Sequence, residues 1–257
     1  QTDDAGNAVI TGMEGNFSVL DIPSSIDGYP VTAISESAFQ QKTALKSVTI
    51  PDSVTSIENY AFYGCTGLTS VTIPNSVTSI GSSAFAGCTG LKEVIYNARA
   101  AEYSKYNVFQ NAGTAADGMK VVFGESVEKI PSNIFYNCES LTSVTIPDSV
   151  TSIGDGAFSC CTSLTSVTIP DSVTSIENYA FRGCTGLKEV IYNAKAITDG
   201  SYAFQGAGTA ADGMKVVFGE SVEEIPEFIF DYCEGLTSLT IGSNVTSIGD
   251  SAFFNCT

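Results

Sequence analysis

A 23-residue unit that recurs along the chain constrains the fold more than any other feature of this sequence. Regular copies occupy residues 45–67, 68–90, 141–163 and 164–186 and follow L-x-x-V-x-I-P-x-S-V-x-x-I-x-x-x-A-F-x-x-C-x-x. A unit this short cannot bury its own apolar side chains, so the copies must stack and share one elongated core. Counting the degenerate copies, the sequence predicts a solenoid of about ten coils.

Each position in the unit has a physical role. In L-x-x-V-x-I the Val and Ile alternate and therefore point to one face of a short strand. The following Pro ends that strand because it has no N–H to donate to a ladder. The A-F-x-x-C segment is expected to form one turn of helix, with Cys on the same side as Ala and Phe. We therefore predict an α/β fold, with short parallel strands on one face and short helical turns and loops on the other.

The coils are not all equivalent. Longer coils are expected at 91–117 and 187–212, and a period of 96 residues relates Leu68 to Leu164 and Leu91 to Leu187. Four-coil blocks have therefore been duplicated as units. Residues 1–20 do not follow the unit and are predicted to cap a repeat domain that spans 21–257. The sequence stops at Thr257 in mid-pattern with no polar capping coil, and begins at Gln1 without an apolar signal segment, so we expect a trimmed and truncated chain.

The motif I-P-x-S-V-x-x-I-x-x-x-A-F-x-x-C, at 50–65, 73–88, 146–161 and 169–184, resembles the BspA-like class of bacterial leucine-rich repeats. The resemblance covers about residues 20 to 257. It implies a right-handed leucine-rich-repeat solenoid, or horseshoe, with a parallel sheet on the concave side. It also implies an extracellular or cell-surface setting in bacteria, with roles in adhesion and protein binding. The class has no shared catalytic residues to carry over.

Composition excludes several classes of function. The chain has 28 acidic and 11 basic residues, a net charge of −17, which repels nucleic acid and anionic lipid. It has no histidine, the commonest general base and metal ligand. No apolar run approaches the roughly 18 residues of a membrane span, and no phosphate-binding loop or nucleophile elbow is present. We expect a monomer that is not an enzyme, carries no cofactor or metal, and does not insert into a membrane.

Seven of the eight cysteines share one position of the repeat unit. Ala112 and Ala207 occupy that position in the two long coils, which indicates a small buried site where Cys acts as a small hydrophobe. We therefore expect free, buried thiols. Cys160 lies next to this position and replaces a Gly of other coils, so either it is exposed and reactive or it has no role. The seven are Cys65, Cys88, Cys138, Cys161, Cys184, Cys233 and Cys256.

The outward strand positions are mostly Thr and Ser, and two places interrupt this uniform surface. There, strands stacked in register would put Glu opposite Lys and a small apolar patch beside them. Apolar side chains ringed by polar groups suit a binding hot spot, although internal sheet packing is the alternative reading. The candidate binding residues are Glu93, Ile95, Lys120 and Val122 in the first block and Glu189, Ile191, Lys215 and Val217 in the second.

The residues inserted in the long coils are the other candidate surface, because extra residues in a solenoid coil emerge as loops. The first insertion, 97–113, contains Tyr103 and Tyr106; the alternative is an inherited spacer. The leading hypothesis is an extracellular or cell-surface adhesion module that binds a protein or extracellular-matrix partner on the concave sheet or the loops. The alternatives are a structural spacer or rigid stalk of a larger surface protein, and a glycan-binding module. The lack of Trp and of an obvious aromatic platform weakens the glycan hypothesis.

Overall fold

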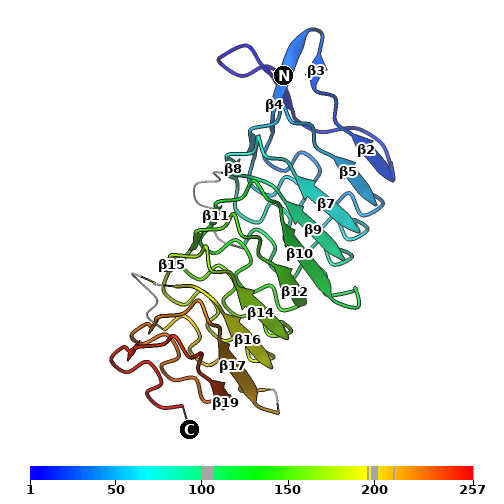
Figure 1. Ribbon diagram of the computed structural model, residues 1–257. Coiled ribbons are helices and arrows are strands. Elements are labelled where there is room, and N and C mark those ends of the chain that lie inside the picture. The colour runs from blue at the N-terminus through cyan, green and yellow to red at the C-terminus, as the bar shows by residue number, and fades with distance from the viewer. Residues whose placement is uncertain (100–106, 196, 198–201, 211, 257) are drawn as a thin grey trace.

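The computed structural model describes residues 1–99, 107–195, 197, 202–210 and 212–256. The chain forms an elongated column of stacked coils, with longer strands along one side and very short strands along the other (Figure 1). Among the strands of the described residues, all pairs are parallel except the hairpin of β3 with β4. This is the pattern of a solenoid in which each coil pairs with the next.

The longer strands form the surface that we call the long-strand face. Six of them pair in the order β12-β10-β9-β7-β5-β2 and four in the order β14-β16-β17-β19. Their bounds are β2 (Val19–Asp21), β5 (Ser47–Thr49), β7 (Ser70–Ile73), β9 (Glu93–Tyr96), β10 (Met119–Phe123), β12 (Leu141–Thr145), β14 (Ser166–Ile169), β16 (Glu189–Tyr192), β17 (Met214–Phe218) and β19 (Leu236–Thr240).

The short strands form three separate ladders on the other side of the column. The first is β1 (Ala8–Ile10), β4 (Tyr29–Ile34), β6 (Ser56–Ile57) and β8 (Ser79–Ile80), with β3 (Ser25–Ile26) beside β4. The second is β11 (Lys129–Ile130), β13 (Ser152–Ile153) and β15 (Ser175–Ile176), and the third is β18 (Glu224–Ile225) with β20 (Ser247–Ile248). The two breaks fall at the long coils, whose described residues contribute a long strand but no short one.

The core is a column of phenylalanine rings, one from each coil, between the two sets of strands. Phe62 and Phe85 stack with centroids 5.1 Å apart and 5° between their planes, and Phe181 and Phe204 do so at 4.9 Å and 5°. The inward Val and Ile of the strands complete this core. The stacked rings are Phe39, Phe62, Phe85, Phe109, Phe135, Phe158, Phe181, Phe204, Phe230 and Phe253.

The expected turn of helix at A-F-x-x-C is wrong, since the described residues contain no helix. In the coil around 58–65, Tyr60, Phe62 and Gly64 donate their N–H groups to carbonyls of the next coil at 3.0, 2.8 and 2.9 Å. The intervening N–H groups bond to carbonyls three residues earlier. An α-helix needs every N–H to bond four residues back, so this alternation excludes one. The fold is therefore a parallel-strand β-solenoid of the leucine-rich-repeat type and not an α/β fold.

Two left-handed residues in each coil also prevent a helix. One precedes the A-F pair and the other precedes the Cys position, as Tyr60 (φ 57°) and Gly64 (φ 68°) show. Gly, Asn and Ser occupy many of these positions, which is expected because a Cβ makes this conformation costly. Cys160 (φ 60°) stands at the second of them, where Gly64 and Gly183 stand in other coils.

We expect the change Cys160→Gly to raise the free energy of unfolding by up to about 1 kcal/mol, because it removes left-handed strain. The matched reverse change is Gly87→Ala. An added Cβ there would lie 3.7 Å from its nearest atoms, so only the backbone (φ 69°) resists it, and we expect a loss of about 1 kcal/mol. Urea unfolding followed by circular dichroism measures both. If the Cys160→Gly variant were less stable, the packing of the Cys160 side chain would stabilise the fold by more than its left-handed backbone destabilises it.

Candidate functional site

The long-strand face brings together the residues that sequence analysis paired, and the predicted register is confirmed. In β9 and β10, Lys120 lies opposite Glu93 and Val122 lies opposite Ile95. The second block repeats this arrangement in β16 and β17. There Lys215 lies opposite Glu189 and Val217 lies opposite Ile191. The two sets stand on the same face, four strand positions apart (Figure 1).

The charged pairs differ between the two blocks. Lys215 Nζ lies 3.6 Å from Glu189 Oε1, and both side chains are about half exposed. Among the described residues, Glu93 and Lys120 are opposite each other but form no ion pair. An exposed pair of this kind contributes about 0.2–1 kcal/mol at most. These charged pairs therefore contribute little to the stability of the fold, and their main effect is on the polarity of the surface.

The apolar side chains form two small patches bordered by threonines. Ile95 and Val122 lie in one lateral row, with Thr72 on one side and Thr145 on the other. Val122 is 36% exposed, and Ile95 is partly exposed. The second block has the same row, with Ile191 and Val217 between Thr168 and Thr240. Each block thus presents two adjacent aliphatic side chains with a hydroxyl-bearing residue on each side.

Many threonines of the regular coils have a structural role, because their hydroxyls bond to the backbone of the preceding coil. Thr69 Oγ1 donates to the carbonyl of Lys46 at 3.1 Å, and Thr142 Oγ1 donates to Met119 at 3.0 Å. On the short-strand side, Thr78 Oγ1 donates to Thr55 at 3.2 Å. Each bond joins one coil to the preceding coil. The repeated hydroxyls therefore stabilise the stack, which leaves the interruptions as the distinctive part of this face.

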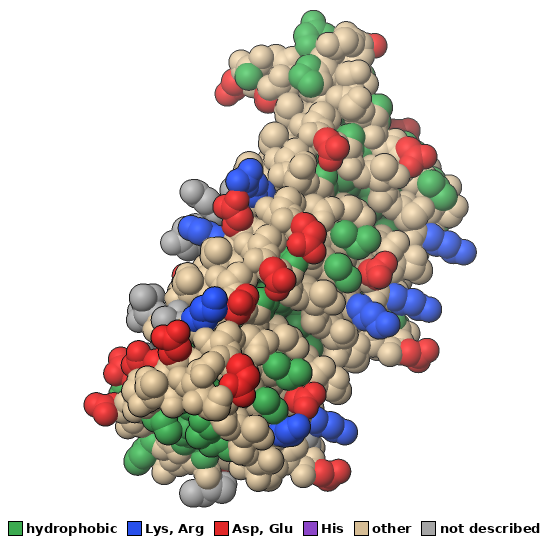
Figure 2. Space-filling model, in the orientation of Figure 1, with side chains coloured by type: hydrophobic (Ala, Val, Ile, Leu, Met, Phe, Trp, Pro, Cys, Tyr) green, Lys and Arg blue, Asp and Glu red, His purple; other side chains and the backbone are tan. Residues whose placement is uncertain are grey.

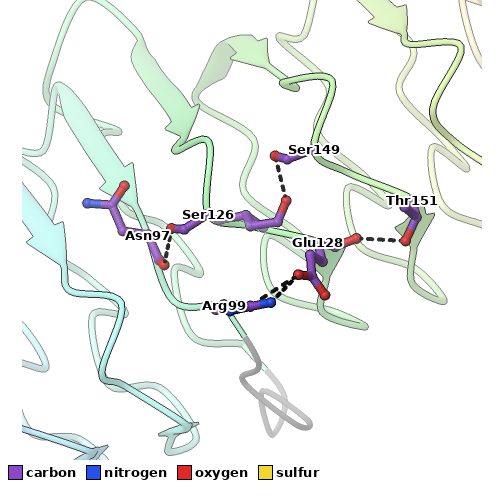
Figure 3. A network of polar contacts seen from close by, with 7 residues as sticks. Asn97, Arg99, Ser126, Glu128, Ser149 and Thr151 are labelled. Carbon is purple, nitrogen blue, oxygen red and sulfur yellow. Dashed lines mark hydrogen bonds and ion pairs between the residues drawn. The ribbon is translucent and has the colours of Figure 1, made fainter.

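The predicted loop residues Tyr103 and Tyr106 lie outside the described residues. The base of their loop is described and is fixed by polar contacts with the next coil (Figure 3). Arg99 Nη2 lies 2.6 Å from Glu128 Oε1, and Ser126 Oγ donates to the carbonyl of Asn97 at 3.1 Å. In the second long coil, Lys195 pairs instead with Asp171 of the preceding coil, at 3.8 Å. The two long coils therefore differ in their ion pair but share the Ser-to-Asn contact, since Ser221 Oγ donates to the carbonyl of Asn193 at 2.6 Å.

The cysteines contribute to the core rather than to a site. All eight are free thiols, and six are buried. Ladder thiols donate to carbonyls of the preceding coil; Cys65 Sγ and Cys184 Sγ lie 3.1 Å from Phe39 O and Phe158 O. Burial raises the pKa of Cys138 to about 12, so this thiol stays neutral at physiological pH. Within the described ranges, no cluster of three or more His, Cys, Asp or Glu side chains is placed to hold a metal ion.

Sequence reasoning missed a row of exposed aromatic side chains, which we call the aromatic edge. All come from the x-A-F-x-x-C turns, and their exposed fractions range from 36% to 53%. A signal was present in the sequence, because Tyr60 and Tyr63 flank the inward pair Ala61 and Phe62 and must therefore point outward. The aromatic edge consists of Tyr60, Tyr63, Tyr136, Tyr179, Tyr232 and Phe254.

Acidic side chains give the column a negative surface. They extend along the whole length of the face in Figure 2, whereas Lys and Arg lie mainly toward its margins. The net charge of −17 makes this surface unfavourable for polyanions. No helix within the described part of the chain is long and apolar enough to cross a membrane.

Comparisons with known proteins show which family and which solved structures share this repeat architecture. The BspA type leucine rich repeat region matches residues 15–116, 105–211 and 200–257, in six copies. No curated protein matches the chain. A leucine-rich repeat protein from Bacteroides ovatus is similar in structure, with a TM-score of 0.52 and 24% identity over 100% of this chain and 78% of that one. A leucine rich cell surface protein from Faecalibacterium prausnitzii has a TM-score of 0.45 and 23% identity over 94% and 92%. The likeness to the Bacteroides ovatus protein shows a shared fold alone.

Proposed function

This chain belongs to the BspA type leucine-rich repeat family, and from that premise we propose that it is a protein-interaction module of a bacterial surface or secreted protein. Its partner is a protein of the surroundings or of an extracellular matrix, which it binds on the long-strand face. The family match supports a repeat module, and solenoids commonly use such extended sheets for binding. The module has no catalytic role in this proposal, and the sequence has no histidine to act as a general base.

One observation supports the long-strand face as the binding surface. The two duplicated blocks carry the same Glu, Lys, Ile and Val in the same lateral register, where other coils carry Thr and Ser. The aliphatic side chains are partly exposed although the strand alternation already fills the core without them. Exposed aliphatic groups with hydroxyl and charged neighbours have the composition of a small interaction hot spot.

The test compares two double variants on the same face. Ile95→Asp with Ile191→Asp puts a charge in each apolar patch, and we expect retention of the partner to fall at least about 10-fold. Thr72→Asp with Thr168→Asp adds the same charges one strand away, opposite the same residues, and we expect a loss of less than about 3-fold. The immobilised chain is incubated with host matrix proteins, and the retained proteins are quantified by mass spectrometry.

The outcomes separate this proposal from its alternatives. Equal retention by the Ile double variant and the wild type would contradict binding at the long-strand face. Retention of no protein by the wild type would favour a structural spacer, which presents length and rigidity rather than a specific surface. Circular dichroism spectra that match the wild type exclude loss of the fold as the cause of a weaker interaction.

A further inference from the structure

The aromatic edge is chemically different from the rest of the surface. Among the described residues of the x-A-F-x-x-C turns, every large exposed apolar side chain is aromatic, and none is Leu, Ile, Val or Met. Their polar neighbours are mostly amides and hydroxyls, such as Asn59, Ser83 and Gln110. Protein-binding surfaces usually combine aromatic residues with Met and Arg. Here the exposed apolar side chains are Tyr and Phe with one Arg beside them, Arg182 over the Tyr179 ring at 5.2 Å to its centroid, and this composition fits a different partner.

Three of these aromatic residues occupy backbone positions that are costly for them. Tyr60 has φ 57°, Tyr179 has φ 59° and Tyr232 has φ 52°. Ser83 and Asn137 fill equivalent left-handed positions in other coils. A bulky side chain in this conformation costs about 1–2 kcal/mol. Every coil is left-handed at these two positions, so a Tyr there costs more than the Ser, Asn or Gly that other coils carry.

Among the described residues, three of the six rings have no aromatic neighbour on the adjacent coils, whereas Tyr179 stacks on Tyr202 and Tyr232 lies edge-on to Phe254. Tyr60 lies between coils that carry Ser37 and Ser83 at its position. Its ring contacts only that of Tyr63, with centroids 5.8 Å apart and planes at 78°. The coils on either side of Tyr136 carry Gln110 and Ser159 at its position. Both rings are more than one-third exposed and project above small or polar neighbours. Aromatic surface of this kind is available to a partner.

The rings recur along the column at three positions of the turn: Tyr60 and Tyr179 precede the A-F position, Tyr136 follows the Phe, and Tyr232 precedes the Cys. Tyr60 and Tyr136 are three coils apart, and Tyr136, Tyr179 and Tyr232 follow at intervals of two coils. At the spacing of neighbouring strands these intervals are about 10–15 Å. Regular recurrence over such a length fits an extended polymer better than a single small molecule. Glu58 and Glu177 lie two residues before Tyr60 and Tyr179, and their negative charges make the aromatic edge unfavourable for a polyanion.

We propose that the aromatic edge binds a neutral polysaccharide. The C–H face of a pyranose ring packs against an aromatic ring, while its hydroxyls bond to phenol, amide and hydroxyl groups. Tyrosine suits this role because its ring is apolar and its hydroxyl end is polar. This surface is separate from the long-strand face, so the two interactions do not depend on each other.

The test uses variants that remove rings without straining the fold. Tyr60→Ser, Tyr179→Ser and Tyr232→Asn are combined, because Ser and Asn already occupy these left-handed positions in other coils. Native gels containing soluble mixed-linkage β-glucan, arabinoxylan, galactomannan or amylose report binding as retardation. We expect at least one of these polysaccharides to retard the wild type. For that polysaccharide, we expect a dissociation constant at least about 10-fold higher for the triple variant. Its thermal midpoint should equal or exceed that of the wild type.

Control measurements test the specificity and the site of polysaccharide binding. Polygalacturonate, an anionic polymer, should not retard the chain, and equal retardation by it would overturn neutral specificity. The variant with Ile95→Asp and Ile191→Asp should bind polysaccharide as the wild type does, whether or not it still binds protein. No retardation of the wild type by any neutral polysaccharide overturns the proposal, as does equal retardation of the triple variant.

Discussion

Replacing Phe158 with Ala should lower the free energy of unfolding by about 3–5 kcal/mol. Phe158 is completely buried and stacks on Phe181, with centroids 5.1 Å apart and 12° between the ring planes. It also lies parallel to Phe135 at 5.9 Å and edge-on to Phe123 at 6.2 Å. Its removal would leave a cavity in the middle of the column, and rings held by their own coils have little freedom to close it. Urea unfolding followed by circular dichroism measures the loss.

The control for this change is Phe254→Ala. Phe254 is 53% exposed and belongs to the aromatic edge rather than to the phenylalanine column, so we expect a loss below about 0.5 kcal/mol. Phe158→Leu should fall between the two, because it keeps part of the buried volume. A loss of less than 1 kcal/mol for Phe158→Ala would show that neighbouring coils shift to fill the space, contrary to a rigid stack.

Alkaline pH should destabilise the fold through its buried thiols. Burial raises the pKa of Cys138 to about 12 and also raises those of Cys161, Cys184 and Cys233 well above the usual value of a thiol. Below about pH 8.5 these thiols are protonated in both states, so they add no pH dependence. Above that pH the unfolded thiols ionise while the folded ones do not, and stability falls. The loss is about 1.4 kcal/mol per thiol per pH unit, or about 5 kcal/mol per unit for four thiols above pH 9.5.

The measurement is urea unfolding at pH 8, 9, 10 and 10.5 under reducing conditions. The control carries Cys138→Ala, Cys161→Ala, Cys184→Ala and Cys233→Ala, because Ala112 and Ala207 already occupy this position and are buried. Its stability should fall far less steeply above pH 9.5. The residual slope belongs to Tyr96, Tyr192 and Cys256, whose pKa values burial raises, and to Cys88, whose pKa is raised by its contact with Cys65 and by burial. The same slope in control and wild type would contradict the assignment to the thiols.

Sequence analysis predicted the stack and its register because both follow from the period of the repeat. Strands that bury the same side chains in successive coils must pair in step, even across a long coil, so Glu93 could be placed opposite Lys120. The turn of helix was wrong for a local reason. An Ala-Phe pair that points inward, followed by Cys three residues after the Phe, is compatible with a helix. It is equally compatible with a turn whose N–H groups bond to the next coil. The N–H partner of Phe62 is the carbonyl of Ala84, which no local pattern reveals.

The aromatic edge could not be predicted from the pattern of the strands alone. The outward direction of Tyr60 follows from its inward neighbours, but its isolation follows from the small residues of two other coils. The candidate patches at Ile95 and Ile191 needed only strand alternation and were therefore accessible from sequence. Their role in binding stays a prediction, whereas their position on the long-strand face is confirmed.

The interrupted ladders of short strands have a mechanical consequence. At the two long coils the described backbone is joined to its neighbours by the long-strand sheet but not by the opposite ladder. The long-strand sheet is itself divided between β12 and β14, so the breaks on the two sides of the column fall at different levels. The turns also bond the long coils to their neighbours, since Phe85 N–H donates to Val108 O at 2.9 Å and Phe181 N–H donates to Ala203 O at 2.8 Å. A duplicated block thus lengthens the column while strand pairing continues on at least one side across each of these breaks.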